Sequence, residues 1–349
     1  MVFQVQGDHA GLTPDWPVLP SCGTGSFTTS DTDFFMRAAR TAYPLKWRIM
    51  DALEGIAAAV WPARFRRATP YLMLLPAVLL VGLLVLGLIQ IADASLRTLD
   101  TTTFQFSEDY SIANFRRALT EPLFLVVAQR SLIAALIVTA VTLVFAFPYA
   151  YLMVRTRSPG LRKFLLIALF LPFFIGQVVR AYGWLIILGN QGMVNEALGL
   201  VGIAPMRLIY NYPAVLFGLV QYMLPFAVLM LAPALTAIPE ELEAAAGSLG
   251  ANWVRTFVHV VLPLARPGFI GAGVVVLTLS LTDFAVPAIL GGGSQDFIAN
   301  AIYDQFFRTS DQGLGATLAL MLVALGSILV GLVFALFGAG TLAMGRSRA

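Results

Sequence analysis

Long apolar segments without charge set the strongest limit on how this chain can fold. A helix that spans a bilayer needs about 20 mostly apolar residues, and its backbone groups must bond to one another because lipid offers no water. Two segments meet this length with a single charge each: Phe164–Asn190 contains Arg180, and Pro267–Gly293 contains Asp283. Four others meet it with no charge: Tyr71–Ala92, Ser131–Val154, Leu208–Pro239 and Gln312–Gly345. The sequence therefore predicts an all-α polytopic membrane protein with six core transmembrane helices.

The charged residues make up 12% of the chain, against about a quarter in a typical soluble domain, and they are unevenly distributed. In membrane proteins Lys and Arg collect in the cytoplasmic loops. With the N-terminus placed in the cytoplasm, the inside segments hold 15 of the 22 Lys and Arg residues. These are Arg37, Arg40, Lys46, Arg48, Arg64, Arg66, Arg67, Arg155, Arg157, Arg162, Lys163, Arg255, Arg266, Arg346 and Arg348. Both termini and the loop 239–266 are therefore expected on the cytoplasmic side.

The chain before the first apolar segment is expected to form a cytoplasmic extension in two parts. Residues 1–44 form a tail in which Ser21–Asp33 is polar and rich in Gly, Ser and Thr, which predicts disorder. Residues 45–67 place apolar side chains along one side of a helix, with Trp47, Trp61 and a basic end. This pattern favours an amphipathic helix lying on anionic lipid. A helix packed on the cytoplasmic face of the protein itself explains it equally well.

The predicted cytoplasmic loop begins with signals for a helix and a tight turn. Pro239 suits the first position of a helix, and Glu240 and Glu241 then complement the positive end of the helix dipole. The small residues Ala244–Ala246 would let a partner surface approach closely. Gly250 is expected to end the helix in the left-handed conformation that glycine adopts at such positions.

A second helix is predicted directly after this turn. Asn252 can cap it with its side chain, and the helix would run from Arg255 to Val260. The pair Leu262-Pro263 is expected to stop it before the next span. The loop is thus predicted to present two short helices joined by a tight turn, an arrangement suited to being held by a partner protein.

At these residues the sequence resembles the permease subunits of binding-protein-dependent ABC importers. Their cytoplasmic signature is Glu-Ala-Ala, three residues, Gly, nine residues and then Ile-x-Leu-Pro. The alanine pair, the glycine and the final segment are matched here at the same spacing. The matching residues are Ala245, Ala246, Gly250, Val260, Leu262 and Pro263. The glutamate position is occupied by Ala244, and a glutamate stands one residue earlier, at Glu243.

Two further stretches look like the spermidine/putrescine-type permeases in particular: FSEDYSIANFRRALTEPLFL before the second span and LTDFAVPAILGGG in the fifth. The resemblance covers residues 68–345 and implies a type I importer domain. It also implies that the loop 239–266 couples this domain to an ATPase subunit. The implied coupling residues are Glu243, Ala244, Ala245, Ala246, Gly250, Ala251, Arg255, Val260, Leu262 and Pro263.

The same resemblance implies a set of partners in the bacterial inner membrane. These are two ATPase subunits that hold ATP and Mg²⁺, a second permease subunit that is identical or homologous, a periplasmic solute-binding protein and membrane lipid. No cofactor on this chain itself and no nucleic acid are expected. The implied solute is a polyamine or a similar small cationic compound. Iron(III) and amino-acid-like or phosphonate compounds remain alternatives.

Charged and polar residues inside the spans are candidates for the solute path. They are Asp283, Arg180, Gln177, Trp184, Gln221 and Tyr222. Arg180 and Asp283 are each the seventeenth residue of a span, which at about 1.5 Å per residue places both about 24 Å from its cytoplasmic end. They could contact solute or form an ion pair with each other, or Arg180 could reach outward to the interface. Gln221 and Tyr222 are explained equally well as groups that hydrogen-bond between helices.

The sequence offers little for catalysis. The histidines are His9 and His259, and there is neither a Cys/His/carboxylate cluster for a metal nor a Walker A motif. The chain is therefore not expected to be an enzyme or to hydrolyse ATP by itself. An ion-coupled secondary transporter is the alternative from another class. Such a protein uses ionisable midplane residues in repeated halves, whereas Asp283 is the one carboxylate in a predicted span and no repeat is visible.

Overall fold

The computed structural model describes residues 49–50, 69–99 and 106–337. The predicted tail 1–44 lies outside the described residues, as does the predicted interfacial helix 45–67 apart from Ile49 and Met50. The chain divides into two parts, Met1–Gly82 and Leu83–Ala349. The first part contains the beginning of helix α3 (Thr69–Ser95), and the candidate site described below belongs to the second part.

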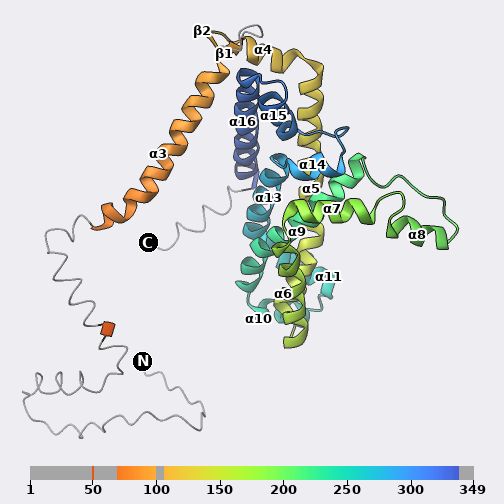
Figure 1. Ribbon diagram of the computed structural model, residues 1–349. Coiled ribbons are helices and arrows are strands. Elements are labelled where there is room, and N and C mark those ends of the chain that lie inside the picture. The colour runs from red at the N-terminus through yellow and green to blue at the C-terminus, as the bar shows by residue number, and fades with distance from the viewer. Residues whose placement is uncertain (1–48, 51–68, 100–105, 338–349) are drawn as a thin grey trace, which may run out of the picture. The chain divides into compact units, whose positions relative to one another are not determined.

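Helices make up most of the described residues of the second part (Figure 1). After α3 they are α4 (Ala113–Thr120), α5 (Pro122–Arg155), α6 (Pro159–Phe174), α7 (Gln177–Ile187), α8 (Met193–Leu200), α9 (Tyr212–Thr236), α10 (Glu240–Ser248), α11 (Trp253–Thr256), the π-helix η1 (Phe257–Val261), α12 (Leu262–Leu264), α13 (Arg266–Leu281), α14 (Ala285–Leu290), α15 (Ile298–Phe307) and α16 (Gln312–Phe337). One short antiparallel hairpin, β1 (Arg97–Leu99) with β2 (Phe106–Tyr110), departs from the predicted all-α content.

The predicted number of spans agrees with the lengths and hydropathy of the described helices. Met73–Ser95 of α3, α5, α9 and α16 are each long and apolar enough to cross a bilayer. Two bent pairs of helices bring the number to six if each pair counts as one span. The pairs are α6 with α7, bent by 98°, and Trp253–Leu264 with α13, bent by 70°.

The third predicted span, 164–190, is not one continuous helix. Ile175 and Gly176 have extended backbones, with ψ angles of 119° and 146°, so α6 ends and α7 begins in a new direction. The fifth predicted span, 267–293, is also divided, because α13 ends at Leu281 and α14 begins at Ala285. The prediction that one continuous helix carries Arg180 is therefore wrong, whereas Asp283 lies two residues beyond the end of the continuous helix α13.

The centre of the bundle is formed by α5, α9 and α13, which pack along one another. Small side chains allow this close approach, as is usual between membrane helices. On α5, Ala134, Ala146 and Ala150 are fully buried. A side-chain carbon added to Gly218 on α9 would lie 2.5 Å from Leu290, so this glycine lets α14 lie directly against α9. These contacts fix the positions from which the candidate site residues extend.

Candidate functional site

The loop between α9 and α13 begins with the predicted helix and glycine turn. Pro239 has an extended backbone and is the residue before α10, one position earlier than predicted. The helix ends in a Schellman motif, in which Ala251 N–H bonds to Ala246 O at 3.1 Å and Gly250 N–H bonds to Gly247 O at 2.9 Å. Gly250 has a φ of +82°, which confirms the predicted left-handed turn.

The second helix of the loop starts as predicted but ends differently. The Asn252 side chain accepts a hydrogen bond of 2.9 Å from Arg255 N–H, which confirms the predicted cap. The helix then changes to the π-helix η1, where Leu262 N–H bonds to Phe257 O. It continues through Pro263 to Leu264, so the prediction that Leu262-Pro263 stops it is wrong. Proline is tolerated in the first turn of α12 because a backbone N–H at that position is not needed for a helical hydrogen bond. The chain bends by 70° only beyond Leu264.

The outer surface of this loop is apolar and exposed. Leu249, at the turn, is 89% exposed, and Trp253 and Val254 are 63% and 57% exposed. Of the predicted coupling residues, Ala244, Ala245, Gly250 and Arg255 are also exposed. Ala246, Ala251, Val260, Leu262 and Pro263 are half-buried, and Leu262 packs against the core of the bundle. The loop therefore has one face on its own bundle and one face available to a partner.

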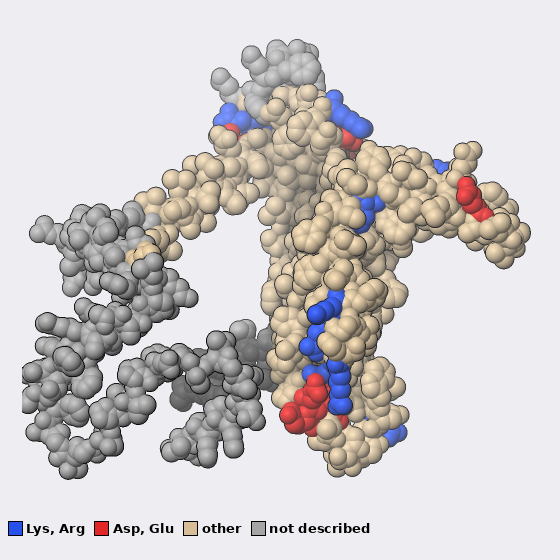
Figure 2. Space-filling view, turned by 60° about the horizontal axis from the view of Figure 1, so that its bottom comes forward, with Lys and Arg blue, Asp and Glu red and all other residues tan. Residues whose placement is uncertain are grey.

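Glu243 does not point to this outer face. Its Oε1 accepts a hydrogen bond of 2.8 Å from Arg155 Nε at the end of α5, and its Oε2 accepts one of 2.6 Å from the Tyr151 hydroxyl. Glu240 lies 4.0 Å from Arg155 and is largely exposed. Figure 2 shows acidic and basic side chains next to each other on the bundle. The structure thus turns the glutamate that stands nearest the signature position inward.

Arg180 and Asp283 do not form the ion pair that was one of the expectations. Arg180 NH2 donates instead to the backbone carbonyls of Pro172 and, at 3.0 Å, Ile175, which lie where α6 ends. Its guanidinium carbon lies 5.5 Å from the centre of the Tyr222 ring. Arg180 therefore donates to carbonyls at the break between α6 and α7, one of which, Pro172 O, also accepts from Ile175 N–H at 3.3 Å. Arg180 has no acidic partner among the described residues.

Asp283 has the corresponding task at the second break. Its Oδ1 accepts a hydrogen bond of 2.9 Å from Val286 N–H in the first turn of α14, and its Oδ2 accepts one from the Gln177 side chain at the start of α7. The side chain is buried, with 7% of the residue exposed. Asp283 thus caps α14 and joins it to α7, which packs against α14.

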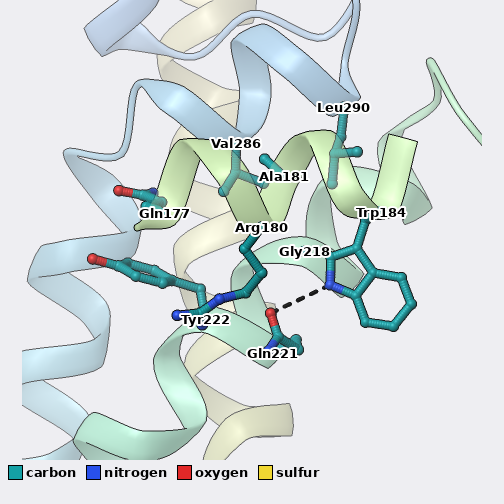
Figure 3. A pocket seen from close by; sticks show the side chains of 9 residues that line it. All are labelled: Gln177, Arg180, Ala181, Trp184, Gly218, Gln221, Tyr222, Val286 and Leu290. Atoms are coloured by element: carbon teal, nitrogen blue, oxygen red, sulfur yellow. Dashed lines mark hydrogen bonds between the residues drawn. The ribbon is translucent and has the colours of Figure 1, made fainter. Parts of the chain in front are cut away.

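The remaining candidate path residues surround a small pocket between α7, α9 and α14 (Figure 3). Its lining residues are Gln177, Arg180, Ala181, Trp184, Gly218, Gln221, Tyr222, Val286 and Leu290. Trp184 Nε1–H donates to Gln221 Oε1 at 3.4 Å across the pocket. The cavity has a volume of about 10 Å³, room for about one water molecule. Five of the six predicted path residues therefore line one pocket, which is closed in this conformation. The sixth, Asp283, does not line the pocket but bonds to the Gln177 side chain.

Sequence reasoning missed the residues that receive the loop. Phe147, Tyr151 and Arg155 follow one another at intervals of four on α5 and so share one side of the helix. The spacing was visible in the sequence, but their partners lie far along the chain, with a separation of 88 residues for Arg155 and Glu243 and of 92 for Tyr151 and Glu243. The described residues contain no group of three or more His, Cys, Asp or Glu side chains that could hold a metal.

The described residues combine up to six potential spans with a loop of short helices that exposes an apolar surface, the arrangement expected of a membrane transport permease. Comparison with known proteins agrees with this class. Residues 144–341 match the family described as "binding-protein-dependent transport system inner membrane component". The chain belongs to this family, and it is a permease subunit of an ABC importer, a multi-pass inner-membrane protein and not itself an enzyme.

Two relatives resemble most of the chain. It is 32% identical over 260 residues to the spermidine/putrescine transport system permease protein PotB of Escherichia coli (strain K12), with 72% of this chain and 94% of that protein covered. It is 33% identical over 255 residues to the PotB protein of Haemophilus influenzae, with 72% and 86% covered. These similarities confirm the predicted resemblance to spermidine/putrescine-type permeases.

Among solved structures, the fold is similar to a chain in the crystal structure of a bacterial ABC transporter involved in the import of the acidic polysaccharide alginate. The TM-score is 0.63 at 18% sequence identity, and 83% of this chain and 100% of that chain are covered. At this identity the similarity concerns the fold alone. It confirms the predicted importer permease fold.

Proposed function

We propose that this chain transmits ATP binding and hydrolysis on two partner ATPase subunits to the movement of a small solute across the inner membrane. The observation that carries the proposal is the loop of α10 and α11, whose exposed Leu249, Trp253 and Val254 form an apolar surface beyond the bundle. ATP and Mg²⁺ would reside on the partners, since this chain has no Walker A motif. A second permease subunit and a periplasmic solute-binding protein would complete the complex.

The proposed solute is a polyamine or a similar small cationic compound. Support comes from the two PotB relatives, which align with most of this chain. The pocket adds no support for a cationic solute, because Arg180 is the one formally charged residue that lines it. If the complex takes up iron(III) or amino-acid-like or phosphonate compounds instead, the proposed solute is wrong, but the chain is still a subunit of an importer.

The proposed orientation has both termini and the loop in the cytoplasm. It rests on the distribution of basic residues, 15 of 22 of which fall on that side. It places the exposed surface of α10 and α11 where cytoplasmic ATPase subunits could bind it.

Reconstitution of the full complex tests the proposal. The chain would be purified in mild detergent together with its associated subunits, and these subunits would be identified. The complex would then be reconstituted in vesicles with the binding protein. We expect radiolabelled spermidine and putrescine to enter only when ATP is present on the ATPase side. Uptake driven by a proton or sodium gradient without ATPase subunits would instead favour the secondary transporter. ATP-driven uptake of other solutes but not of polyamines would overturn the solute class alone.

Two N-terminal deletions test the predicted extension, which lies outside the described residues apart from Ile49 and Met50. Removing residues 1–40 is expected to leave transport largely intact, because this segment is polar and lies outside the residues that match the relatives' family. Removing residues 1–65 is expected to impair assembly or stability in the membrane, because it also removes the predicted interfacial helix. Uptake and the amount of assembled complex would be measured for both. Loss of uptake in the shorter deletion would contradict the assignment of a dispensable tail.

A further inference from the structure

The cytoplasmic end of α5 carries three side chains that all face the loop 239–266. Phe147, Tyr151 and Arg155 lie four residues apart, which places them on one side of the helix. Arg155 is the last residue of α5, where a cation also complements the negative end of the helix dipole. This side of α5 is therefore a receiving surface for the loop, although α5 is not adjacent to the loop in the sequence.

The polar part of this surface is the Arg155–Glu243 pair. Arg155 NH2 lies 2.7 Å from Glu243 Oε1, and Arg155 Nε donates to the same oxygen at 2.8 Å. Arg155 NH2 also donates to Ile238 O at 2.8 Å, just before α10, and the Tyr151 hydroxyl donates to Glu243 Oε2. The two side chains are 14% and 18% exposed, so water competes little for their bonds. Charge-assisted bonds in such surroundings hold their partners in one geometry.

The apolar part of the surface is a row of aromatic rings. Trp253 stacks on Phe257 with ring centres 5.1 Å apart, and Phe257 lies 4.8 Å from Phe147 on α5. Phe147 in turn lies 4.6 Å from Phe269 on α13. Because Trp253 is largely exposed, the row begins at the surface available to a partner and ends in the core.

We propose that the Arg155–Glu243 pair makes α5 move with the loop, and that both residues are positioning residues for coupling. The inference rests on the proposed function, in which ATPase subunits bind and displace the loop. A displacement of α10 would otherwise reach the membrane through α9 and α13, the helices that flank the loop in sequence, and would reach α5 only through the aromatic contacts of Trp253 and Phe257. Through the pair it also reaches α5, which packs along both α9 and α13 in the centre of the bundle. In this arrangement Glu243 is engaged within its own chain and is not a contact for the ATPase.

A double-mutant cycle on the whole reconstituted complex tests this proposal. Arg155→Gln and Glu243→Gln are each expected to lower the amount of solute imported per ATP hydrolysed by about fivefold or more, the range of typical coupling between sites. The double variant is expected to be no worse than either single variant, because all three lack the same interaction. Glu241→Gln in α10 and Arg157→Gln, two residues beyond the end of α5, are matched controls, since both residues are exposed, and they should keep the wild-type ratio.

The amount of solute imported per ATP hydrolysed distinguishes a role in coupling from a role in stability alone. A purely structural role would lower assembled complex, ATP hydrolysis and uptake together and leave the ratio unchanged. Tyr151→Phe removes one hydroxyl while its ring contacts remain, so it serves as the mild variant if the charge variants do not assemble, and it should lower the ratio less. An unchanged ratio in these variants, or independent effects that multiply in the double variant, would overturn the proposal. If the wild-type complex shows no ATP-driven uptake, the proposed function itself fails.

Discussion

Replacing Gly250 with valine is expected to abolish ATP-driven uptake while the spans still insert in the membrane. Gly250 has a φ of +82°, a region that costs an L-residue about 1–2 kcal/mol and that a β-branched side chain resists further. No atom lies within 4 Å of the position that a side-chain carbon would occupy, so the penalty is conformational and not a clash. Relief of the strain would redirect α11 and with it Trp253, on the surface proposed to bind the ATPase.

Two variants serve as controls for this prediction. Gly250→Asn should transport better than Gly250→Val, because asparagine tolerates the left-handed region. Gly247→Ala, one turn earlier in α10, should behave as wild type, since that glycine is helical and a side-chain carbon there meets nothing within 4 Å. The measurements are uptake, co-purification of ATPase subunits and the amount of inserted chain. Wild-type uptake by Gly250→Val would show that the turn is not needed for coupling.

The spans and the loop could be predicted from the sequence because their signals are local. Charge-free apolar length is sufficient to indicate a membrane helix. The turn of the loop follows from Gly250 and from Asn252, each of which acts within a few residues of its own position. The π-helix η1 was not predicted, and neither was the continuation through Pro263, because a proline near a helix start and one at a helix end look alike in sequence.

The breaks in the third and fifth spans could not be predicted from the sequence, because the residues that stabilise them depend on how the helices pack. Pro172 and Gly176 are visible near the first break, but membrane helices tolerate such residues when neighbours satisfy the backbone. The partners that stabilise the breaks are Arg180 for α6 and Asp283 for α14. Their opposite charges suggested an ion pair, whereas in the structure Arg180 donates to two backbone carbonyls and Asp283 accepts from one backbone N–H and from the Gln177 side chain. These contacts depend on the tertiary packing of the helices, and they change the effects expected of mutations at the two residues.

Asp283→Ala is expected to lower the stability of the protein and its transport more than Asp283→Asn. Alanine leaves both Val286 N–H and the Gln177 side chain without their acceptor in a buried site, and each lost partner costs about 1–3 kcal/mol. Asparagine keeps one oxygen for Val286 N–H, and the Gln177 amide can rotate to accept from the new amide group. Thermal unfolding in detergent and uptake of radiolabelled putrescine would be measured for both variants.

Arg180→Gln is not expected to rescue either variant of Asp283, because the two side chains do not form an ion pair in the structure. Its own effect should be a loss of stability, since the carbonyls of Pro172 and Ile175 lose a charged donor at the break. The two sites should therefore contribute separately in a double-mutant cycle. Recovery of stability and uptake in the Arg180→Gln, Asp283→Asn double variant would show that the charges compensate each other after all. A stable Asp283→Asn protein that fails to import a cationic solute would show instead that the carboxylate charge acts on the solute.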